Sequence, residues 1–435
     1  MKLSRYNSYI SLGDKAGLIY NAFSDSFITV KSSSDDFEKI LKSDLQSISP
    51  LLIQQMKDAG ALISEEIDEA EAVKNRIESV DNDDSFLYIH INPTLDCNFR
   101  CWYCYENHVK DSCMSPDTIR NIVKLIEDRI EKQQNLKLIH LSFFGGEPLL
   151  RFNEVVKPLI SKISAICTAH EIRLSVHFTS NSFLLDDEMI SFLKEYNSGF
   201  QITLDGGREN HNRTRFGKGG IPSFDGILEN VKKLALSKIP VGLRINYTRD
   251  NIDSTEEIIN IISEWPDETK KIITVDYQRV WQDRSHRSND PVYDKARIFR
   301  KRLRNAGYLV RNNRIINGVA NSCYGDKRNQ LLVNYNGDVF CCTARDFKSE
   351  NRLGYLDENG QVVWEGDGFE KRMSLKFSKP ACHRCRIAPI CGGGCRTQAV
   401  EHIDSDPEKC MYSYSDELID EYIIERFEER YMEDK

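Results

Sequence analysis

From residue 85 onward the chain alternates apolar, strand-like runs with amphipathic helical stretches, and this alternation restricts the fold more than any other feature. The strand-like runs are FLYIHI, LIHLSFFG, IRLSVHFTS, FQITLDG, VGLRINYT and ITVDYQRV, separated by helical patterns such as PDTIRNIVKLIEDRIEKQ and FDGILENVKKLALSK. Repeated strand–helix alternation predicts an α/β fold with a parallel sheet covered by helices. Because six such units are fewer than a closed barrel needs, we expect a partial (β/α)6 TIM-like barrel over residues 85–308.

The segments on either side of the predicted barrel follow other patterns. Residues 1–66 contain three short strand-like runs, YNSYISL, AGLIYNA and SFITVK, and then two helical stretches, which predicts a small separate module. Residues 67–84 are acidic and lack a wide apolar stripe, so we expect a partly helical linker. Residues 309–435 contain a hairpin-like LLVNYNGDVFCC, many cysteines and a terminal amphipathic helix, which indicates a cysteine-rich domain.

Composition excludes several functional classes. The 435 residues carry 59 Lys and Arg against 67 Asp and Glu, a net charge of −8, which argues against nucleic acid as the partner. The sequence has no signal-peptide pattern and no apolar run long enough to span a bilayer, so we expect no membrane association. Thirteen cysteines in a long chain without an export signal indicate reduced thiols available to metals, and therefore a cytoplasmic protein.

Three cysteines follow the first strand of the predicted barrel, where the active site of such folds gathers. Cys97, Cys101 and Cys104 are spaced CxxxCxxC. Three thiolates bound to a [4Fe–4S] cluster leave one iron free to bind another molecule, which suits a catalytic cluster. A structural zinc site is the alternative, but this spacing lacks the paired knuckles typical of one.

The CxxxCxxC loop, with Tyr103 before its last cysteine, resembles the radical S-adenosylmethionine (SAM) superfamily. Matching motifs follow at later strand ends: FFGGEP, TSN, and TLDG with HNRTRFGKGG. The resemblance implies that SAM binds beside the cluster and yields a 5′-deoxyadenosyl radical. The implied SAM-binding residues are Tyr103, Gly145, Gly146, Glu147, Ser180, Asn181, Asp205 and Arg215. The candidates for substrate contact or catalysis are His211, Arg244 and Asn246.

The cysteines of the C-terminal region resemble the SPASM extension of the same superfamily, which carries two auxiliary [4Fe–4S] clusters, for a total of three. The resemblance implies that the outer auxiliary cluster is bound by Cys382, Cys385, Cys391 and Cys410. It implies that the inner one is bound by Cys323, Cys342 and Cys395. A zinc or structural role is the alternative. Cys113 and Cys167 match nothing, and we expect a loop thiol and a core residue.

The inner auxiliary cluster departs from the fully ligated family pattern. The stretch CYGDKRNQLL lacks a further cysteine, and Asn329 stands about where one is expected. Cys341 is adjacent to Cys342, and neighbouring side chains on a strand point to opposite faces, so we expect only one of them to be a ligand. Three protein ligands leave an open iron that favours binding of a substrate thiolate and formation of a thioether.

The N-terminal module suggests the substrate. Its three strands and helices, ending in DAGALI, resemble the winged-helix-like peptide-recognition element of ribosomal peptide maturases. The resemblance implies that residues 6–65 bind the leader of a precursor peptide, and strand addition to a sheet edge is the natural mode. A DNA-binding winged helix is the first alternative, although no Lys/Arg cluster marks a recognition helix. A purely structural cap is the second.

These resemblances together imply a peptide-modifying radical enzyme that installs a thioether or carbon–carbon cross-link. Such an enzyme also requires a low-potential electron donor such as flavodoxin or ferredoxin. An anaerobic sulfatase-maturing enzyme, which forms formylglycine from Cys or Ser, is the alternative with the same barrel and cysteines. An iron–sulfur electron-transfer or scaffold protein is the non-enzymatic alternative, for which the GGEP and TSN positions have no use.

Overall fold

The computed structural model describes residues 1–13, 16–31, 36–42, 44–283, 290–311, 319 and 322–431. The chain divides into two units, each built from segments far apart in the sequence. The first unit consists of Met1–Asp83, Arg314–Arg328 and Glu370–Lys435, and the second of Asp84–Asn313 and Asn329–Phe369. The break at Asp83 lies within one residue of the expected boundary at 84, and the cysteine-rich region contributes segments to both units.

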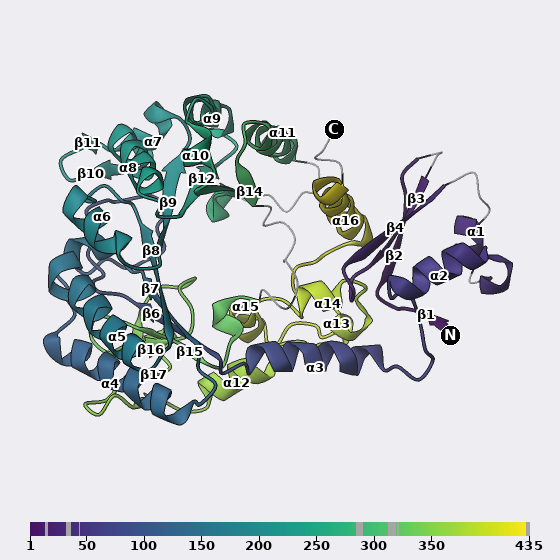
Figure 1. The fold of residues 1–435 in the computed structure, drawn as a ribbon, viewed down its shortest axis with the longest axis horizontal. Helices are drawn as coiled ribbons and strands as arrows, with labels where there is room; N and C mark the ends of the chain where they lie inside the picture. The colour runs from purple at the N-terminus through teal and green to yellow at the C-terminus, as the bar shows by residue number, and fades with distance from the viewer. Residues whose placement is uncertain are drawn as a thin grey trace. The chain divides into compact units, whose positions relative to one another are not determined.

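The second unit is built on a sheet in which the six expected strands lie side by side and parallel (Figure 1). They are β6 (Phe86–Ile91), β7 (Leu138–Phe143), β8 (Arg173–Ser180), β9 (Ser198–Asp205), β12 (Val241–Tyr247) and β13 (Ile273–Arg279). Their order in the sheet is their order in the chain, as in a barrel of successive strand–helix units. The α/β fold with a partial barrel is confirmed.

Helices cover one face of this sheet (Figure 1). They are α4 (Pro116–Lys132), α5 (Lys157–Ala169), α6 (Asp187–Lys194), α8 (Phe224–Leu236), α9 (Thr255–Ser263) and α11 (Pro291–Asn305), with the shorter α7 (Arg208–Thr214), α10 (Asp267–Lys270), β10 (Phe216–Gly217) and β11 (Ile221–Pro222) between them. Along β6, Leu87, Ile89 and Ile91 are fully buried in the apolar core. Tyr88 and His90 alternate with them, so they point to the opposite face of the sheet.

The sheet continues beyond the predicted barrel at both ends. At one end β14 (Leu309–Arg311) pairs parallel with β13, and at the other β15 (Gln330–Val333) pairs parallel with β6. β16 (Asp338–Phe340), β17 (Gly354–Leu356) and β18 (Val362–Trp364) follow β15 as antiparallel neighbours, which confirms the expected hairpin. Residues 329–369 therefore extend the barrel sheet and do not fold with the rest of the cysteine-rich region.

The N-terminal part of the first unit is a three-stranded antiparallel sheet of β2 (Asn7–Ser11), β3 (Ala16–Asn21) and β4 (Ser26–Lys31). All three strands were expected, and so were α1 (Asp36–Leu41) and α2 (Pro50–Asp58); the pair of β1 (Lys2–Leu3) with β5 (Leu62–Ile63) was not. One face of the sheet packs through Ile19 and Ile28 against Met56 of α2. The other face packs through Leu18 and Tyr20 into a second core.

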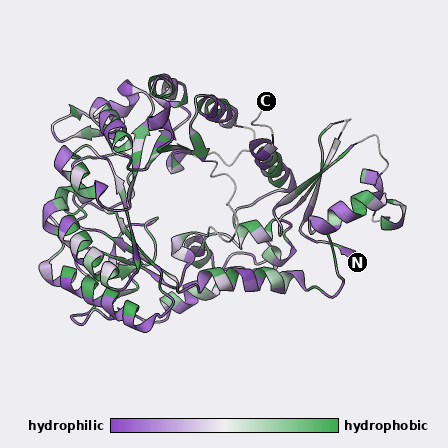
Figure 2. Ribbon diagram, in the orientation of Figure 1, coloured by the Kyte–Doolittle hydropathy of each residue, from purple (hydrophilic) through white to green (hydrophobic). Residues whose placement is uncertain are grey.

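The segment predicted as a partly helical acidic linker contains the helix α3 (Glu69–Asp81), which packs into this second core. Asp68 caps its N-terminus by accepting hydrogen bonds from the N–H groups of residues 70 and 71. Val73 and Ile77 are buried one turn apart, and Figure 2 shows apolar residues interspersed with polar ones along the helix. Val80 also packs against this core, so the stripe runs over i, i+4 and i+7, and the helix ends are buried at Glu69 and Asp81.

The C-terminal part of the first unit consists of short helices and the expected terminal helix. They are α12 (Gly368–Ser374), α13 (Pro380–Arg384), α14 (Ala388–Cys391), α15 (Arg396–Glu401) and α16 (Asp416–Tyr431). Ile387 and Ile419 join Leu18, Tyr20 and Ile77 in one apolar core, so the N-terminal sheet and the cysteine-rich segments fold together. No helix among the described residues is both long and apolar enough to cross a membrane.

Candidate functional site

The loop after β6 contains the three cysteines of the CxxxCxxC motif. Cys97 and Cys101 are half-buried and pack against the barrel core, whereas Cys104 is exposed. The Phe99 N–H donates to Cys97 Sγ over 3.4 Å, the kind of hydrogen bond that supports a thiolate bound to iron. Asp96 braces the loop by accepting from the N–H groups of Cys97 (2.8 Å) and Asp111 (3.0 Å).

Burial raises the pKa of these thiols in the metal-free chain. Desolvation raises the pKa of Cys97 and of Cys101, although Arg215 opposes the shift at both sites. The pKa of Cys104 rises to about 11, again chiefly through desolvation. Because burial favours the thiol form, binding of iron at these cysteines would release protons.

Gly145 and Gly146 bring the end of β7 against the cysteine loop. A Cβ atom on Gly146 would lie 2.0 Å from the carbonyl oxygen of Asp96, and one on Gly145, which has φ +78°, would lie 2.8 Å from that of Thr94. The N–H of Glu147 donates to the same Asp96 carbonyl over 2.8 Å. The two glycines thus permit contact between two backbone segments, a role beyond the SAM binding that the family resemblance implies for them.

Glu147 links the ends of β7 and β8. It is 1% exposed, and its Oε1 accepts from Ser180 Oγ (2.8 Å) and the Leu149 N–H (3.0 Å), while Oε2 accepts from the Asn181 N–H (2.8 Å). A carboxylate offers about four acceptor positions, so Oε2 retains one for a further donor. Asn181 Nδ2 donates to Asn98 Oδ1 over 2.8 Å, which connects this group to the cysteine loop.

A second polar group joins the cysteine loop to the ends of β9 and β12. The Tyr103 hydroxyl donates to Asp205 Oδ2 over 2.5 Å and accepts from Arg215 Nη1 over 2.7 Å and from Asn246 Nδ2 over 3.3 Å. Register pairs Asp205 directly with Asn246. The Arg215 guanidinium also lies 5.9 Å from the centre of the Phe99 ring. Tyr103, Asp205, Arg215 and Asn246 therefore meet at one place beside the cysteines.

Buried polar atoms without a hydrogen-bond partner surround this loop. They are Asn98 Nδ2, Glu106 Oε2 and Arg215 Nε. Unsatisfied donors and acceptors are costly in a protein interior, which favours a bound polar molecule that pairs with them. Together with the three thiols, these atoms fit a cofactor such as SAM at an iron–sulfur cluster.

The sequence analysis did not single out Glu106 or Asn98, which the structure adds to the site. Desolvation raises the pKa of Glu106 to about 8, with a hydrogen bond from the Gly146 backbone opposing the shift. The signal in the sequence was the position of Glu106, two residues after Cys104, and of Asn98 directly after Cys97.

His211 lies behind the site and contacts the backbone of Asp205. It is fully buried, its Nδ1 accepts from the Asp205 N–H over 3.1 Å, and its Nε2 lies 3.0 Å from Ser223 Oγ. Because Nδ1 accepts, Nε2 carries the proton and donates to Ser223. Desolvation lowers the pKa of His211 to about 3, so the ring is neutral. This geometry favours a positioning role over contact with substrate.

Arg244 lies on β12 beside Asp276 of β13. Its Nε donates to Asp276 Oδ2 over 3.2 Å, and the two residues are paired in the register of the sheet. Arg244 is partly exposed, with 36% of its side chain accessible. Arg244 is therefore accessible to a ligand, and Asp276 orients it.

Four C-terminal cysteines line one pocket in the first unit. Cys382, Cys385, Cys391 and Cys410 surround it together with Tyr412 and Tyr414. Desolvation and the neighbouring Cys385, Cys382 and Cys410 together raise the pKa of Cys391 to about 12, which reflects how close the four thiols lie. This is the set expected for the outer auxiliary cluster.

The other three predicted ligands are distributed over both units, and their assignment stays a prediction. Cys323 and Cys395 belong to the first unit and Cys342 to the second. Cys342 Sγ accepts from the Ala344 N–H over 3.3 Å, while the adjacent Cys341 is buried, at 4% exposed. Among the described residues, no three His, Cys, Asp or Glu side chains converge to hold a single metal ion.

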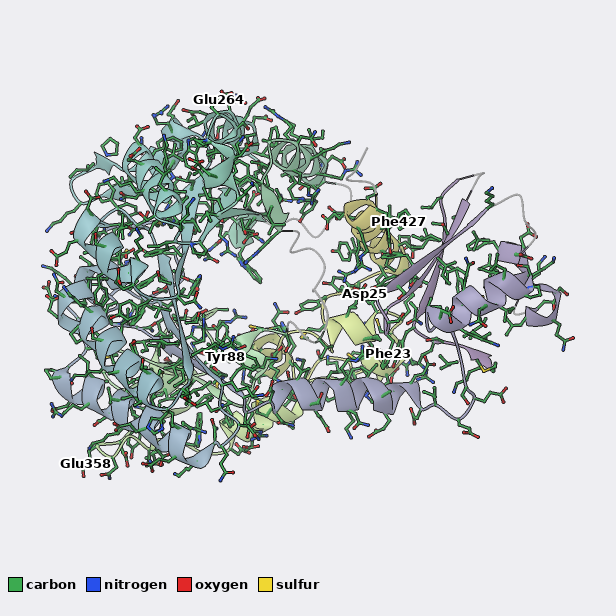
Figure 3. The ribbon with its side chains drawn as sticks, viewed as in Figure 1. Phe23, Asp25, Tyr88, Glu264, Glu358 and Phe427 are labelled. Atoms are coloured by element: carbon green, nitrogen blue, oxygen red, sulfur yellow. The ribbon has the colours of Figure 1, made fainter. Side chains whose placement is uncertain are left out.

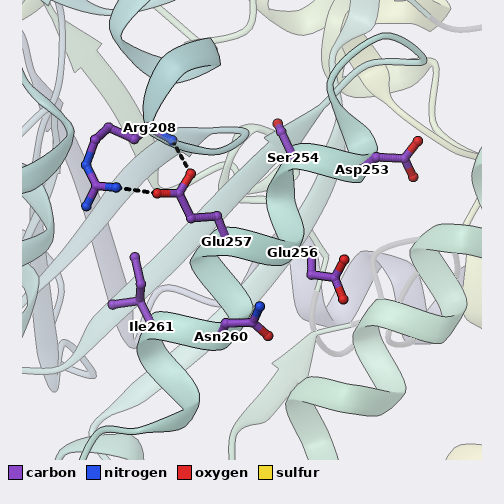
Figure 4. A pocket seen from close by; sticks show the side chains of 7 residues that line it. All are labelled: Arg208, Asp253, Ser254, Glu256, Glu257, Asn260 and Ile261. Atoms are coloured by element: carbon purple, nitrogen blue, oxygen red, sulfur yellow. Dashed lines mark hydrogen bonds and ion pairs between the residues drawn. The ribbon is translucent and has the colours of Figure 1, made fainter.

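A hollow on the surface of the second unit contains none of the predicted site residues. Figure 4 shows it between the start of α7 and α9, where Arg208 pairs with Glu257. Asp253, Ser254, Glu256, Asn260 and Ile261 complete its lining. It carries no cysteine and no unsatisfied buried polar atom, so it is not the candidate site.

Comparison with known proteins identifies two domains. A family model described as the radical SAM superfamily matches residues 91–262, and one described as SPASM, an iron–sulfur cluster-binding domain, matches residues 323–386. A cysteine-type anaerobic sulfatase-maturating enzyme of Clostridium perfringens is 23% identical over 381 residues, which cover 78% of this chain and 97% of that protein.

Two solved structures are similar to this chain. Native anSMEcpe with bound AdoMet and Cp18Cys peptide has a TM-score of 0.59 at 19% identity and covers 79% of this chain and 98% of its own. Streptococcus suis SuiB bound to precursor peptide SuiA has a TM-score of 0.52 at 15% identity and covers 94% of this chain and 98% of its own. At these identities, the likeness shows a shared fold.

Proposed function

Since this chain carries a radical SAM domain followed by a SPASM iron–sulfur domain, we propose that it is a maturase of a ribosomally made precursor peptide. It abstracts a hydrogen atom from the peptide and installs a cross-link, which is a thioether or a carbon–carbon bond. The observation that carries this proposal is the N-terminal sheet, whose outer strand β4 borders a groove.

The groove suits an extended peptide. It is lined by Ser26, Phe27, Ile28 and Thr29 of β4, by the end of α2 and by the end of α16. An outer strand offers backbone N–H and C=O groups to an added strand, and the alternating side chains beside it provide selectivity. The leader of the precursor docks here, which raises the concentration of the core peptide at the barrel.

The fold shared with SuiB supports this reading. The likeness covers 94% of this chain, so the unmatched residues are too few to include the whole N-terminal module. The fold shared with anSMEcpe covers 79%, which leaves enough residues unmatched to include the whole module. SuiB is described as bound to a precursor peptide, and we infer a substrate of the same class for this chain.

Cofactor binding follows from the site. Cys97, Cys101 and Cys104 hold the catalytic [4Fe–4S] cluster. When bound there, SAM supplies a 5′-deoxyadenosyl radical to the substrate. Glu147 would accept from the SAM amino group through the free position on Oε2, and Arg215 and Asp205 fix the Tyr103 hydroxyl beside the cysteine loop. The close contact of residues 145–147 with the loop excludes water from this side.

Two auxiliary clusters complete the proposal. Cys382, Cys385, Cys391 and Cys410 hold the outer one, and Cys323, Cys342 and Cys395 hold the inner one. Asn329 is not a fourth ligand, because its amide is bonded to the Phe86 carbonyl (2.9 Å) and to the Gln133 side chain (2.9 and 3.0 Å). Three protein ligands favour binding of a cysteine thiolate from the substrate and hence a thioether.

An anaerobic sulfatase-maturing enzyme is the second candidate. It is favoured by the relative from Clostridium perfringens, of which this chain covers 97%, and by the higher TM-score of anSMEcpe. For either function we propose a cytoplasmic location, where thiols stay reduced, and electrons from a low-potential flavodoxin or ferredoxin.

Mass spectrometry of the small peptide encoded beside this gene, co-expressed with and without the protein, tests the proposal. If the proposal is correct, the co-expressed peptide has lost the mass of two hydrogen atoms, because a cross-link removes two hydrogen atoms and adds none. Conversion of a cysteine in a co-expressed sulfatase to formylglycine, which replaces its sulfur by oxygen and removes two hydrogen atoms, or of a serine by loss of two hydrogen atoms, with the peptide unmodified, would establish the second candidate instead.

The role of the groove is tested by point variants, because deletion of residues 1–66 would expose the core shared by Leu18, Tyr20 and Ile419. Thr29→Arg places a long charged side chain in the groove from an exposed position on β4. Ser11→Arg makes the same change at an exposed position on β2, the opposite edge of the sheet. We expect only Thr29→Arg to weaken leader binding, and equal affinity for both variants would show that the module is a cap.

A further inference from the structure

Asp81, the last residue of α3, collects several hydrogen bonds inside the first unit. It is 2% exposed. Its carboxylate accepts from Arg396 Nη2 (2.9 Å), from Lys376 Nζ (3.1 Å to the nearer oxygen) and from Ser322 Oγ (3.2 Å). Its backbone carbonyl also accepts from the Arg328 N–H over 2.7 Å. One side chain therefore connects three segments that are distant in the sequence.

Two of these partners are direct neighbours of predicted cluster ligands. Ser322 precedes Cys323, and Arg396 follows Cys395. Asp326 closes the connection, because it pairs with Lys376 Nζ over 3.1 Å and its carbonyl accepts from Arg396 Nη1 over 2.8 Å. The N–H of Asp326 in turn donates to the Cys323 carbonyl over 2.9 Å. The loops that present both cysteines are thus tied to the end of α3.

The charges in this network are taken out of water. The side chains of Asp81, Lys376, Asp326 and Arg396 are 2%, 2%, 8% and 5% exposed. Burial of two carboxylates and two cations is tolerated only when each has its partners in good geometry, and an apolar replacement is often as stable. Such a network specifies a local arrangement more than it contributes stability.

Further contacts accompany this network. Cys395 is half-buried, and its N–H donates to the Tyr412 hydroxyl over 2.9 Å. At the opposite end of α3, Glu69 accepts from Ser4 Oγ (2.5 Å) and the Arg5 N–H (3.0 Å), which fixes the helix against the N-terminal module.

From these contacts we infer that Asp81 is a positioning residue for Cys323 and Cys395, the two ligands of the inner auxiliary cluster that lie in this unit. The inference rests on the proposed ligand set. Asp81 acts through Ser322 and Arg396 and touches no cluster itself. The helix that follows the peptide-recognition module thereby sets the geometry of an iron–sulfur site.

The test uses the full-length protein, reconstituted with iron and sulfide under anaerobic conditions. Asp81→Asn keeps the size of the side chain but removes the charge that Arg396 and Lys376 share. We expect the electron paramagnetic resonance signal of the inner auxiliary cluster to shift or disappear, with loss of about a third of the iron when the cluster is not retained. The signals of the other two clusters should persist. Glu78→Gln, at an exposed carboxylate one turn earlier on α3, is the matched control.

Unchanged signals and iron content in a folded Asp81→Asn protein would overturn the inference. If that variant does not fold, Ser322→Ala decides, because it removes one hydrogen bond without leaving a buried charge unpaired; an unaltered inner-cluster signal in it also overturns the inference. Cys395→Ala tests the proposed ligand set separately, because it removes one of the proposed ligands of the inner auxiliary cluster. If Cys395→Ala loses iron while Asp81→Asn does not, only the role of Asp81 is wrong.

Discussion

Tyr103 in the cysteine loop and Asp205 at the end of β9 are 102 residues apart in the sequence, yet the Tyr103 hydroxyl donates to Asp205 Oδ2 over 2.5 Å. Arg215 donates to the same hydroxyl, so three elements converge on one oxygen atom. This arrangement holds the loop between Cys101 and Cys104 in place independently of the cluster that we propose for these cysteines.

Replacement of Tyr103 should therefore affect SAM more than the cluster. Tyr103→Phe removes the shared hydroxyl and leaves Asp205 and Arg215 without their common partner. We expect roughly tenfold weaker SAM binding, consistent with the loss of hydrogen bonds to charged groups. Equilibrium dialysis with labelled SAM measures this, and the catalytic cluster should keep its iron. Tyr355→Phe, at an exposed position on β17 of the same unit, should bind SAM normally.

Gly146 is predicted to tolerate no side chain. In Gly146→Ala the added methyl group overlaps the Asp96 carbonyl, so the cysteine loop must move away from β7. We expect a loss of about 1–3 kcal/mol in unfolding free energy, as for other overpacked sites, and poor retention of the catalytic cluster. Iron analysis and thermal unfolding measure both effects.

Gly226→Ala is the control for that experiment. Its methyl group meets only the Phe183 ring at 3.6 Å, and alanine favours the helix α8. A Gly146→Ala protein as stable and as iron-rich as Gly226→Ala would contradict the close packing described here.

The three loop cysteines should be required for radical generation alone. Simultaneous replacement of Cys97, Cys101 and Cys104 by Ala should abolish formation of 5′-deoxyadenosine and leave the auxiliary iron in place, because the four-cysteine pocket belongs to the other unit. Chromatography of reactions with SAM and dithionite measures the nucleoside. Undiminished 5′-deoxyadenosine from this variant would disprove the catalytic assignment.

Docking of α16 on the N-terminal sheet should weaken in acid. Figure 3 labels Asp25 and Phe427 where the helix meets the sheet. Burial raises the pKa of Asp25, but hydrogen bonds from Arg426, Arg430 and Tyr20 outweigh it and lower the pKa below its ordinary value. A lowered carboxyl pKa contributes stability above the unfolded-state value, and that contribution is lost as the pH falls through the folded-state value.

Asp25→Asn tests this dependence, and asparagine tolerates the left-handed backbone at this position, where φ is 55°. Hydrogen exchange of α16 should show about 1 kcal/mol less protection than the unaltered protein at neutral pH. The difference should shrink below about pH 4. A difference that does not change with pH would show that the charge of Asp25 is irrelevant. Asp404→Asn, at an exposed carboxylate in the same unit, serves as the control.

Local patterns in the sequence predicted the strands of the barrel and the hairpin of β15 and β16. Each of these elements has a hydrophobic period that its own residues reveal. The residues of α3 were predicted only as a partly helical linker, because its apolar stripe of Val73, Ile77 and Val80 is narrow and its buried ends are polar. Nothing within residues 67–84 reveals that Asp81 meets Arg396, since the partner lies 315 residues away.

By itself, the sequence determined the α/β barrel, the cysteine spacing and the residues at the strand ends, because period and motif are properties of neighbouring residues. Only the tertiary structure decided which of those residues meet. It joined Glu147 to Ser180 and Tyr103 to Asp205, and it placed the N-terminal sheet in one core with the four-cysteine pocket. Such contacts depend on how distant segments pack to bury apolar surface and to satisfy buried polar groups, and no local pattern records them.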